Sequence, residues 1–260
     1  MPALRKAVEG IDSCMKFYSV LLSLCLLCMF VNESFYVHAA EQTNADAREI
    51  IAGLIKIAES GDAEAQTALG IIYKKGRMGE KDYKKALFWL DKAARQNNPD
   101  ALYQLAEMYE KGLGTPRNYG KAMRLFLQAG ALGNMLAQFR AGLFYLNGWG
   151  THQDYNEAAR LFGLAANQNF GRAQYALGML YEKGLGVKQD FALANEWFEK
   201  AAMQGLPDAA MSLAINFLKG RGLPRSQELA RDMFDVACRQ GLEKACDARN
   251  LLDKGEIPVF

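Results

Sequence analysis

The stretch Asp100–Met135 reads DALYQLAEMYEKGLGTPRNYGKAMRLFLQAGALGNM, and its pattern returns at steps of 36 residues along most of the chain. Three columns show the repeat: an alanine column, an aromatic column and a glycine column. They contain Ala65, Ala101, Ala137, Ala173, Ala209 and Ala245; Tyr73, Tyr109, Tyr145, Tyr181 and Phe217; and Gly76, Gly112, Gly148, Gly184 and Gly220. Five copies without an insertion indicate stacked supersecondary units, each too small to bury its own apolar face.

Each copy is predicted to form two helices. In the quoted copy, Asn98, Pro99 and Asp100 suit the N-cap, the first turn and the positive end of the first helix, which ends at Gly112. A second glycine follows two residues later in every copy except the first, which has Met78. The second helix opens in the five copies on a side chain that can cap it: Asp82, Asn118, Asp154, Asp190 and Ser226. Its core face repeats a small, large, small pattern, as in Ala122, Phe126 and Ala129.

The phrases AQYALGMLYEKGLGVKQD (173–190) and WFEKAAMQG (197–205) resemble the Sel-one-like repeat family, a relative of tetratricopeptide repeats. The resemblance covers about residues 61–253. It implies an all-α fold, a right-handed α-solenoid of five 36-residue helix-turn-helix repeats with capping helices. It also implies a concave face that holds other proteins, because members of the family are known mainly as adaptors.

The resemblance also bears on two cysteines. Cys238 and Cys246 stand where the preceding copy has Ala202 and Ala210, positions that face each other in this family and are bridged by disulfides in its cysteine-rich secreted members. An even cysteine count in an exported chain favours a Cys238–Cys246 bond. The alternative is a pair of buried free thiols that act as small hydrophobic side chains.

The first 40 residues precede the repeats and follow the plan of a secretory signal peptide. An apolar run over 17–31 follows Lys16 and leads to Ala39 and Ala40, after either of which cleavage is expected. The alternative is a membrane anchor, but 15 apolar residues fall short of the roughly 20 that a spanning helix needs. The protein is therefore expected to be periplasmic or secreted.

The repeat register also predicts capping segments at both ends of the array. Leu54 aligns with Leu90 in the step of 36, whereas Arg249 and Asp253 replace the core Leu and Tyr after the last copy. The seven residues after Asp253 are expected to be frayed. The predicted segments are a signal peptide (1–40), an N-terminal capping helix (41–60), five repeats (61–242), and a C-terminal capping helix with a tail (243–260).

The charge of the chain is balanced, with 31 Lys and Arg against 29 Asp and Glu, and the net charge stays at +2 when residues 1–40 are removed. A balanced chain has no excess positive field to hold nucleic acid or an anionic membrane, so neither is expected as a partner.

Catalytic patterns are scarce. After the leader one histidine remains, His152, in a connection between helices, which excludes a two-histidine metal site in residues 41–260. A Ser-x-x-Lys pattern occurs at Ser13–Lys16, inside the leader, without the motifs that accompany it in β-lactam enzymes. We therefore predict no catalytic residue, no cofactor and no metal, and an enzyme acting on β-lactams or the cell wall is the disfavoured alternative.

A partner-binding groove is predicted on the first helix of each copy. Positions spaced i, i+3 and i+7 vary between copies and share a face away from the core, the face that lines the concave side in related repeats. An exposed apolar strip of this kind is typical of a peptide site. Packing between repeats is the alternative for these residues. The predicted groove residues are Ile71, Glu107, Arg140, Leu143, Met179 and Ile215.

Trp149 is a second candidate for partner binding, because it replaces Leu or Arg in an exposed loop and Trp is enriched at binding hot spots. The alternative is a side chain folded back on the neighbouring copy.

Together these patterns favour an exported, non-enzymatic scaffold, a monomer or weak oligomer, that binds a protein or peptide in the bacterial cell envelope as an adaptor, regulator or assembly factor. An immunity protein that neutralises a periplasm-targeted toxin is the alternative role.

Overall fold

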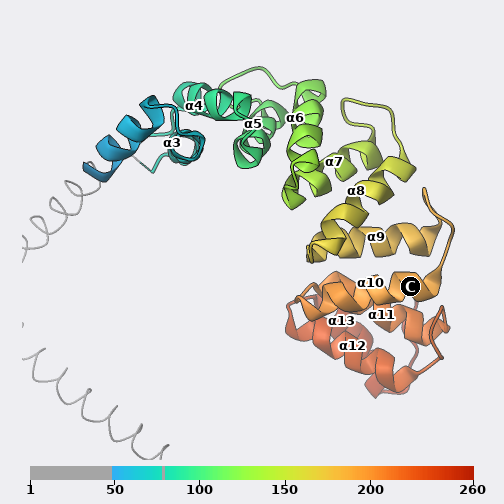
Figure 1. Cartoon of the computed structure of the whole chain (residues 1–260). Coiled ribbons are helices and arrows are strands. Elements are labelled where there is room, and N and C mark those ends of the chain that lie inside the picture. The colour runs from blue at the N-terminus through green and yellow to red at the C-terminus, as the bar shows by residue number, and fades with distance from the viewer. Residues whose placement is uncertain (1–48, 78–79) are drawn as a thin grey trace, which may run out of the picture. The chain divides into compact units, whose positions relative to one another are not determined.

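The computed structural model describes residues 49–77 and 80–260, in which every regular element is helical (Figure 1). The chain divides into two compact units, Met1–Ile57 and Ala58–Phe260, and the second contains all the repeats. Residues 49–59 are helical. The predicted signal peptide (1–40) and Met78 lie outside the described residues.

Each repeat contributes one first-type and one second-type helix, and helices that are neighbours in sequence pack against each other (Figure 1). The first-type helices are α3 (Ala63–Lys75), α5 (Pro99–Lys111), α7 (Met135–Asn147), α9 (Gly171–Lys183) and α11 (Pro207–Lys219). The second-type helices are α4 (Tyr83–Arg95), α6 (Tyr119–Ala131), α8 (Tyr155–Asn167), α10 (Phe191–Met203) and α12 (Gln227–Arg239). A further helix, α13 (Glu243–Asp253), follows the fifth pair. The all-α solenoid of five repeats is confirmed.

The five predicted caps of the second-type helices are all confirmed. Each side chain accepts a hydrogen bond from a backbone N–H in the first turn of its helix. Each of these cap residues also donates its own backbone N–H to the carbonyl of the aromatic-column residue in the same repeat, at 2.8–3.0 Å. The connection between the two helices of a repeat is therefore closed by two hydrogen bonds that recur in all five copies.

The core of each repeat lies where the small and large side chains of the second-type helix meet the first-type helix. Leu90, Phe126, Phe162, Phe198 and Phe234 are fully buried, as are the alanines that flank them. Close packing requires small residues opposite these rings. A Cβ added to Gly178, for example, would lie 2.7 Å from the ring of Phe198.

The glycine loops connect each repeat to the one before it. The first glycine of each loop ends the first-type helix in the left-handed conformation, with φ between 66° and 70°. The second also has positive φ and lies against the start of the preceding second-type helix. A Cβ on Gly186 would lie 2.1 Å from the carbonyl carbon of Tyr155, and Gly114, Gly150 and Gly222 make equivalent contacts.

Buried glutamines join consecutive helices at three junctions. Gln66, Gln138 and Gln174 each donate a side-chain hydrogen bond to the carbonyl eight residues earlier, on Ala58, Gly130 and Ala166 respectively. Their side-chain oxygens accept hydrogen bonds from Gln96, Gln168 and Gln204, at 2.7–2.9 Å. Each buried amide is thus paired at both ends, as burial of a polar group requires.

Substitution of Gly186 by alanine is predicted to destabilise the fold more than an equivalent change elsewhere. It adds a clash with Tyr155 to the cost of positive φ, so we expect a loss of about 2–5 kcal/mol. Gly133→Ala is the matched control, because Gly133 also has positive φ but no heavy atom within 4 Å of an added Cβ. It should cost about 1–2 kcal/mol. Urea unfolding measures both, and equal losses would contradict the close-contact explanation.

Candidate functional site

A cavity of about 660 Å³ lies between the first-type helices α7 and α9 and the start of α11. Its walls are mostly apolar, with Arg172, Lys183 and Asp208 as the charged residues of the lining. Two predicted groove residues, Leu143 and Met179, line it. The other large apolar side chains of the wall are Phe139, Leu146, Tyr175, Leu180, Leu185 and Leu206.

One register position in the wall of the cavity holds a small side chain. Ala176 stands where the two preceding copies have Arg140 and Gln104. The wall is apolar because Leu143 and Leu146 stand where the preceding copy has Glu107 and Glu110. Sequence reasoning named Leu143 and Met179 as groove residues, but it did not predict Leu146 and Leu206 of the same wall.

The equivalent region one repeat earlier is filled by charged side chains. The Lys74 ammonium donates to Glu107 and Gln104 at 2.8 Å each, which links α3 to α5. Arg140 donates to Glu110 and links α7 to α5. The alternative interpretation, packing between repeats, therefore describes Glu107 and Arg140, and a role for them in partner binding stays a prediction.

The surroundings of Glu107 and Tyr103 in this polar region determine the protonation states of the two side chains. Burial alone would raise the pKa of Glu107, but the hydrogen bond and charge of Lys74, with Lys111 at 3.3 Å, lower that pKa overall. Burial, together with the charge of Glu107, raises the pKa of Tyr103 to about 12. At neutral pH the surface therefore presents an ionised carboxylate and a protonated phenol.

The remaining predicted residues lie away from the cavity. Ile71 and Ile215 are partly buried, and Ile215 packs against the core of the last repeat. Trp149 stacks on Tyr119 of the preceding repeat, with ring centroids 6.2 Å apart, and meets Phe144 edge-on at 5.7 Å. Trp149 is thus folded back on its neighbour, as the alternative interpretation stated, and remains 41% exposed.

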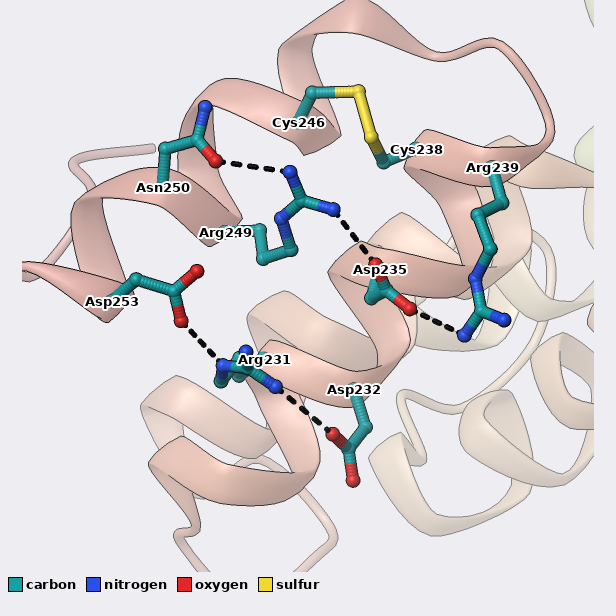
Figure 2. Close-up of polar contacts among 9 residues, drawn as sticks. All are labelled: Arg231, Asp232, Asp235, Cys238, Arg239, Cys246, Arg249, Asn250 and Asp253. Atoms are coloured by element: carbon teal, nitrogen blue, oxygen red, sulfur yellow. Dashed lines mark hydrogen bonds and ion pairs between the residues drawn. A yellow bond between two sulfur atoms is a disulfide. The ribbon is translucent and has the colours of Figure 1, made fainter.

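The C-terminal cap combines a disulfide with ion pairs (Figure 2). Cys238 on α12 and Cys246 on α13 are bonded, with their Cα atoms 4.7 Å apart, so the predicted disulfide is present. Arg249 donates to Asp235 at 2.8 Å, and Asp253 accepts from Arg231. The two polar residues that replace core positions in α13 therefore pair with charges on α12 (Figure 2).

The expectation that the last seven residues are frayed is wrong. Pro258 is buried, the ring of Phe260 stacks on Phe234 at 5.6 Å, and Lys219 donates to the Phe260 carbonyl at 3.2 Å. The reason is that Phe234 belongs to the last second-type helix, so no sixth complete repeat covers it. Leu252 and the tail supply that cover instead.

Two further features of residues 49–77 and 80–260 bear on function. No group of three or more His, Cys, Asp or Glu side chains in these ranges is arranged to hold a metal ion. None of the helices described there combines the length and apolar character needed to cross a membrane.

Five stacked helix pairs with a cavity on their first-type helices define an α-solenoid repeat scaffold. Sel1 repeats match this sequence at residues 63–98, 99–134, 136–170, 171–206 and 207–242. The chain belongs to the Sel1 repeat family. No curated protein matches the sequence.

Solved structures of similar proteins share this fold. A Sel1 repeat protein from Oxalobacter formigenes is 28% identical, with 77% of this chain and 80% of that chain covered and a TM-score of 0.69. The protein c5321, a protective antigen of uropathogenic Escherichia coli with an SLR fold, is 26% identical over 79% of this chain, with a TM-score of 0.65. This chain spans about half of c5321, 52% of its length.

The immunity protein PA5088 from Pseudomonas aeruginosa is also similar, at 24% identity over 81% of this chain and 79% of that chain. Its TM-score is 0.46.

Removal of the disulfide is predicted to loosen the C-terminal cap. The bond closes a loop with a sequence separation of 8, so the Cys238→Ala, Cys246→Ala variant should lose about 2–3 kcal/mol of unfolding free energy. Urea unfolding measures the loss, and hydrogen exchange of the α13 amides locates it. Reductant should lower the stability of the unaltered protein but leave the variant unchanged. An unaltered protein that is insensitive to reductant would contradict this prediction.

The Glu107 ion pair is predicted to contribute stability that depends on pH. Because its folded-state pKa lies below the ordinary value of 4.5, the contribution is complete above that pH and is lost as pH falls through the folded-state pKa. Glu107→Gln should therefore destabilise the protein at pH 7, and the difference should shrink in acid. Urea unfolding from pH 7 to pH 3 tests this, with Glu196→Gln on the exposed face of α10 as control. A difference that does not change with pH would exclude the ion pair as its source.

Proposed function

We propose that this chain is a non-enzymatic scaffold of the cell envelope that binds a protein partner by its apolar side chains, in the cavity between α7, α9 and α11. The cavity carries this proposal, because its wall is mostly apolar and includes the predicted groove residues Leu143 and Met179. Roles as an adaptor, a regulator or an assembly factor all require this same binding step.

The composition of the cavity supports a peptide segment as ligand. A volume of about 660 Å³ is in the range of sites that bury several apolar groups. Leu143, Met179 and Tyr175 provide an apolar wall, and Arg172, Lys183 and Asp208 provide polar contacts that can orient a bound backbone. Phe139 and Tyr175 also pack on the core rings of Phe162 and Phe198, so this part of the wall is held in place by the fold.

Two features support an envelope location. Structural disulfides persist in oxidising compartments, and Cys238 and Cys246 form one. The sequence of residues 1–40 follows the plan of a signal peptide with cleavage after Ala39 or Ala40, a prediction that lies outside the described residues.

Ala176→Arg is predicted to abolish partner binding by filling the cavity, as Arg140 fills the equivalent region one repeat earlier. The matched control is Ala68→Arg, which places the same side chain at the same register position in the first repeat. Both variants and the unaltered protein are used to capture partners from cell-envelope extract, after circular dichroism has shown equal helicity. We expect a captured protein that is retained by the control and reduced at least tenfold by Ala176→Arg, a loss of about 1.4 kcal/mol or more.

A second variant, Leu143→Glu with Met179→Glu, tests the apolar wall by the same measurement. If Ala176→Arg and this variant both bind like the unaltered protein, the cavity is not the binding site. The exposed ring of Trp149 would then be the next candidate.

A further inference from the structure

The positive charge of this chain is concentrated at one end of the row of second-type helices. α4 contains four basic residues and one acidic residue, and α6 contains two basic residues and no acidic one. α8 contains one of each, α10 one basic and two acidic, and α12 two basic and three acidic. The near-zero net charge of the whole chain therefore hides a gradient that falls from α4 to α12.

The basic residues of α4 share one face of the helix. At 3.6 residues per turn, positions 84, 85, 88, 92 and 95 fall within an arc of about 100°. The buried residues Ala86, Leu90 and Ala93 lie on the opposite side. The arc, here called the α4 basic face, consists of Lys84, Lys85, Phe88, Lys92 and Arg95, all of them exposed.

Much of this charge is free to meet a partner. Arg95 pairs with Asp91 at 2.8 Å, and Lys85 lies 3.5 Å from the Asp82 carboxylate. Lys84 and Lys92 have no acidic partner within the described part of the chain. Lys81, just before the helix, is exposed but lies between Glu80 and Asp82, so that segment adds no net positive charge.

An exposed aromatic ring stands among these charges. Phe88 is 52% exposed, and the Lys92 ammonium lies 4.5 Å from the centre of its ring. The corresponding residues in the other copies are Arg124, Arg160, Glu196 and Asp232, so the ring is specific to the first repeat. The Phe88 ring meets Trp89 edge-on, with ring centroids 5.0 Å apart, whereas the buried core residues Ala86, Leu90 and Ala93 lie on the opposite side of α4.

We propose that the α4 basic face docks on a membrane surface rich in anionic phospholipid. Basic side chains around an exposed aromatic ring on an amphipathic helix match such a surface, since the ring enters the headgroup region while the ammonium groups meet phosphates. Long lysine stems allow the charges to reach the headgroups as the ring inserts. The neutral and acidic faces of α8, α10 and α12 gain nothing from that surface, so contact is confined to the first repeats.

This inference is independent of the cavity and differs from the sequence-based expectation that anionic membranes are not partners. That expectation used the net charge of the whole chain, whereas the field at a surface depends on charges within about 10 Å, the screening length at moderate salt.

The test is a sedimentation assay that measures binding of the protein to lipid vesicles. The protein is used in the processed form purified from cells, and mass spectrometry determines its N-terminus. Vesicles of phosphatidylglycerol with phosphatidylethanolamine are compared with vesicles of phosphatidylcholine. We expect binding to the anionic vesicles that weakens as salt is raised. Lys84→Glu with Lys92→Glu should reduce the partition coefficient at least about tenfold, and Phe88→Ser should weaken binding without changing the charge.

The matched control is Lys188→Glu with Lys200→Glu, which changes the net charge equally in the fourth repeat. Lys200 lies 4.2 Å from the ring of Trp197, an arrangement like that of Lys92 and Phe88. The control should bind like the unaltered protein. Absence of binding to anionic vesicles, equal binding to phosphatidylcholine, or equal losses in the two charge-reversed variants would each overturn the proposal. Competition by soluble glycerol phosphate would show that the α4 basic face binds free phosphate. Charge-dependent capture of an acidic protein, without binding to vesicles, would show that it binds a protein. Either result would overturn the proposal that this face docks on a membrane.

Discussion

In the last four repeats the second glycine of the loop contacts the first turn of the preceding second-type helix, and the stacking of this solenoid depends on that contact. At Gly186 the main chain approaches Tyr155 so closely that no side chain fits between them. The same contact recurs at three other loops, so it sets one spacing between successive repeats. The buried phenylalanines and alanines then fill a gap of constant width, which explains why the same residue types return at a fixed step of 36.

At each junction between repeats, two positions eight residues apart face each other, and different residue types join the helices there. A buried glutamine that bonds to the carbonyl eight residues earlier serves three junctions, and apolar residues serve the second and the fifth: Leu102 at the second, and Ala202 with Ala210 at the fifth. At the end of the array, Cys238 and Cys246 occupy these positions and form a covalent bond. A terminal helix has a neighbour on one side only, so a covalent bond there replaces the packing that an inner helix receives from both sides.

The fold could be predicted from the sequence because its determinants are local and repeated: caps, glycine stops and core columns each recur five times. The candidate site could be predicted only in part. Leu143 and Met179 were predicted to line a groove and do line the cavity, but Leu146 and Leu206 of the same wall were not predicted. Glu107 and Arg140 find charged partners 30 or more residues away, and Phe260 covers a ring that lies 26 positions earlier. Such pairings are set by three-dimensional proximity, and a column of residue types does not reveal them.

The position of the cavity has a mechanical consequence. In a solenoid each repeat touches only its neighbours, so small rotations between successive repeats add up along the array. The cavity is lined by helices of three consecutive repeats, α7, α9 and α11. A ligand that fills the cavity would contact all three helices and restrict rotation between their repeats. Binding there would therefore make the solenoid more rigid and limit the angles at which the two ends of the solenoid can meet other molecules.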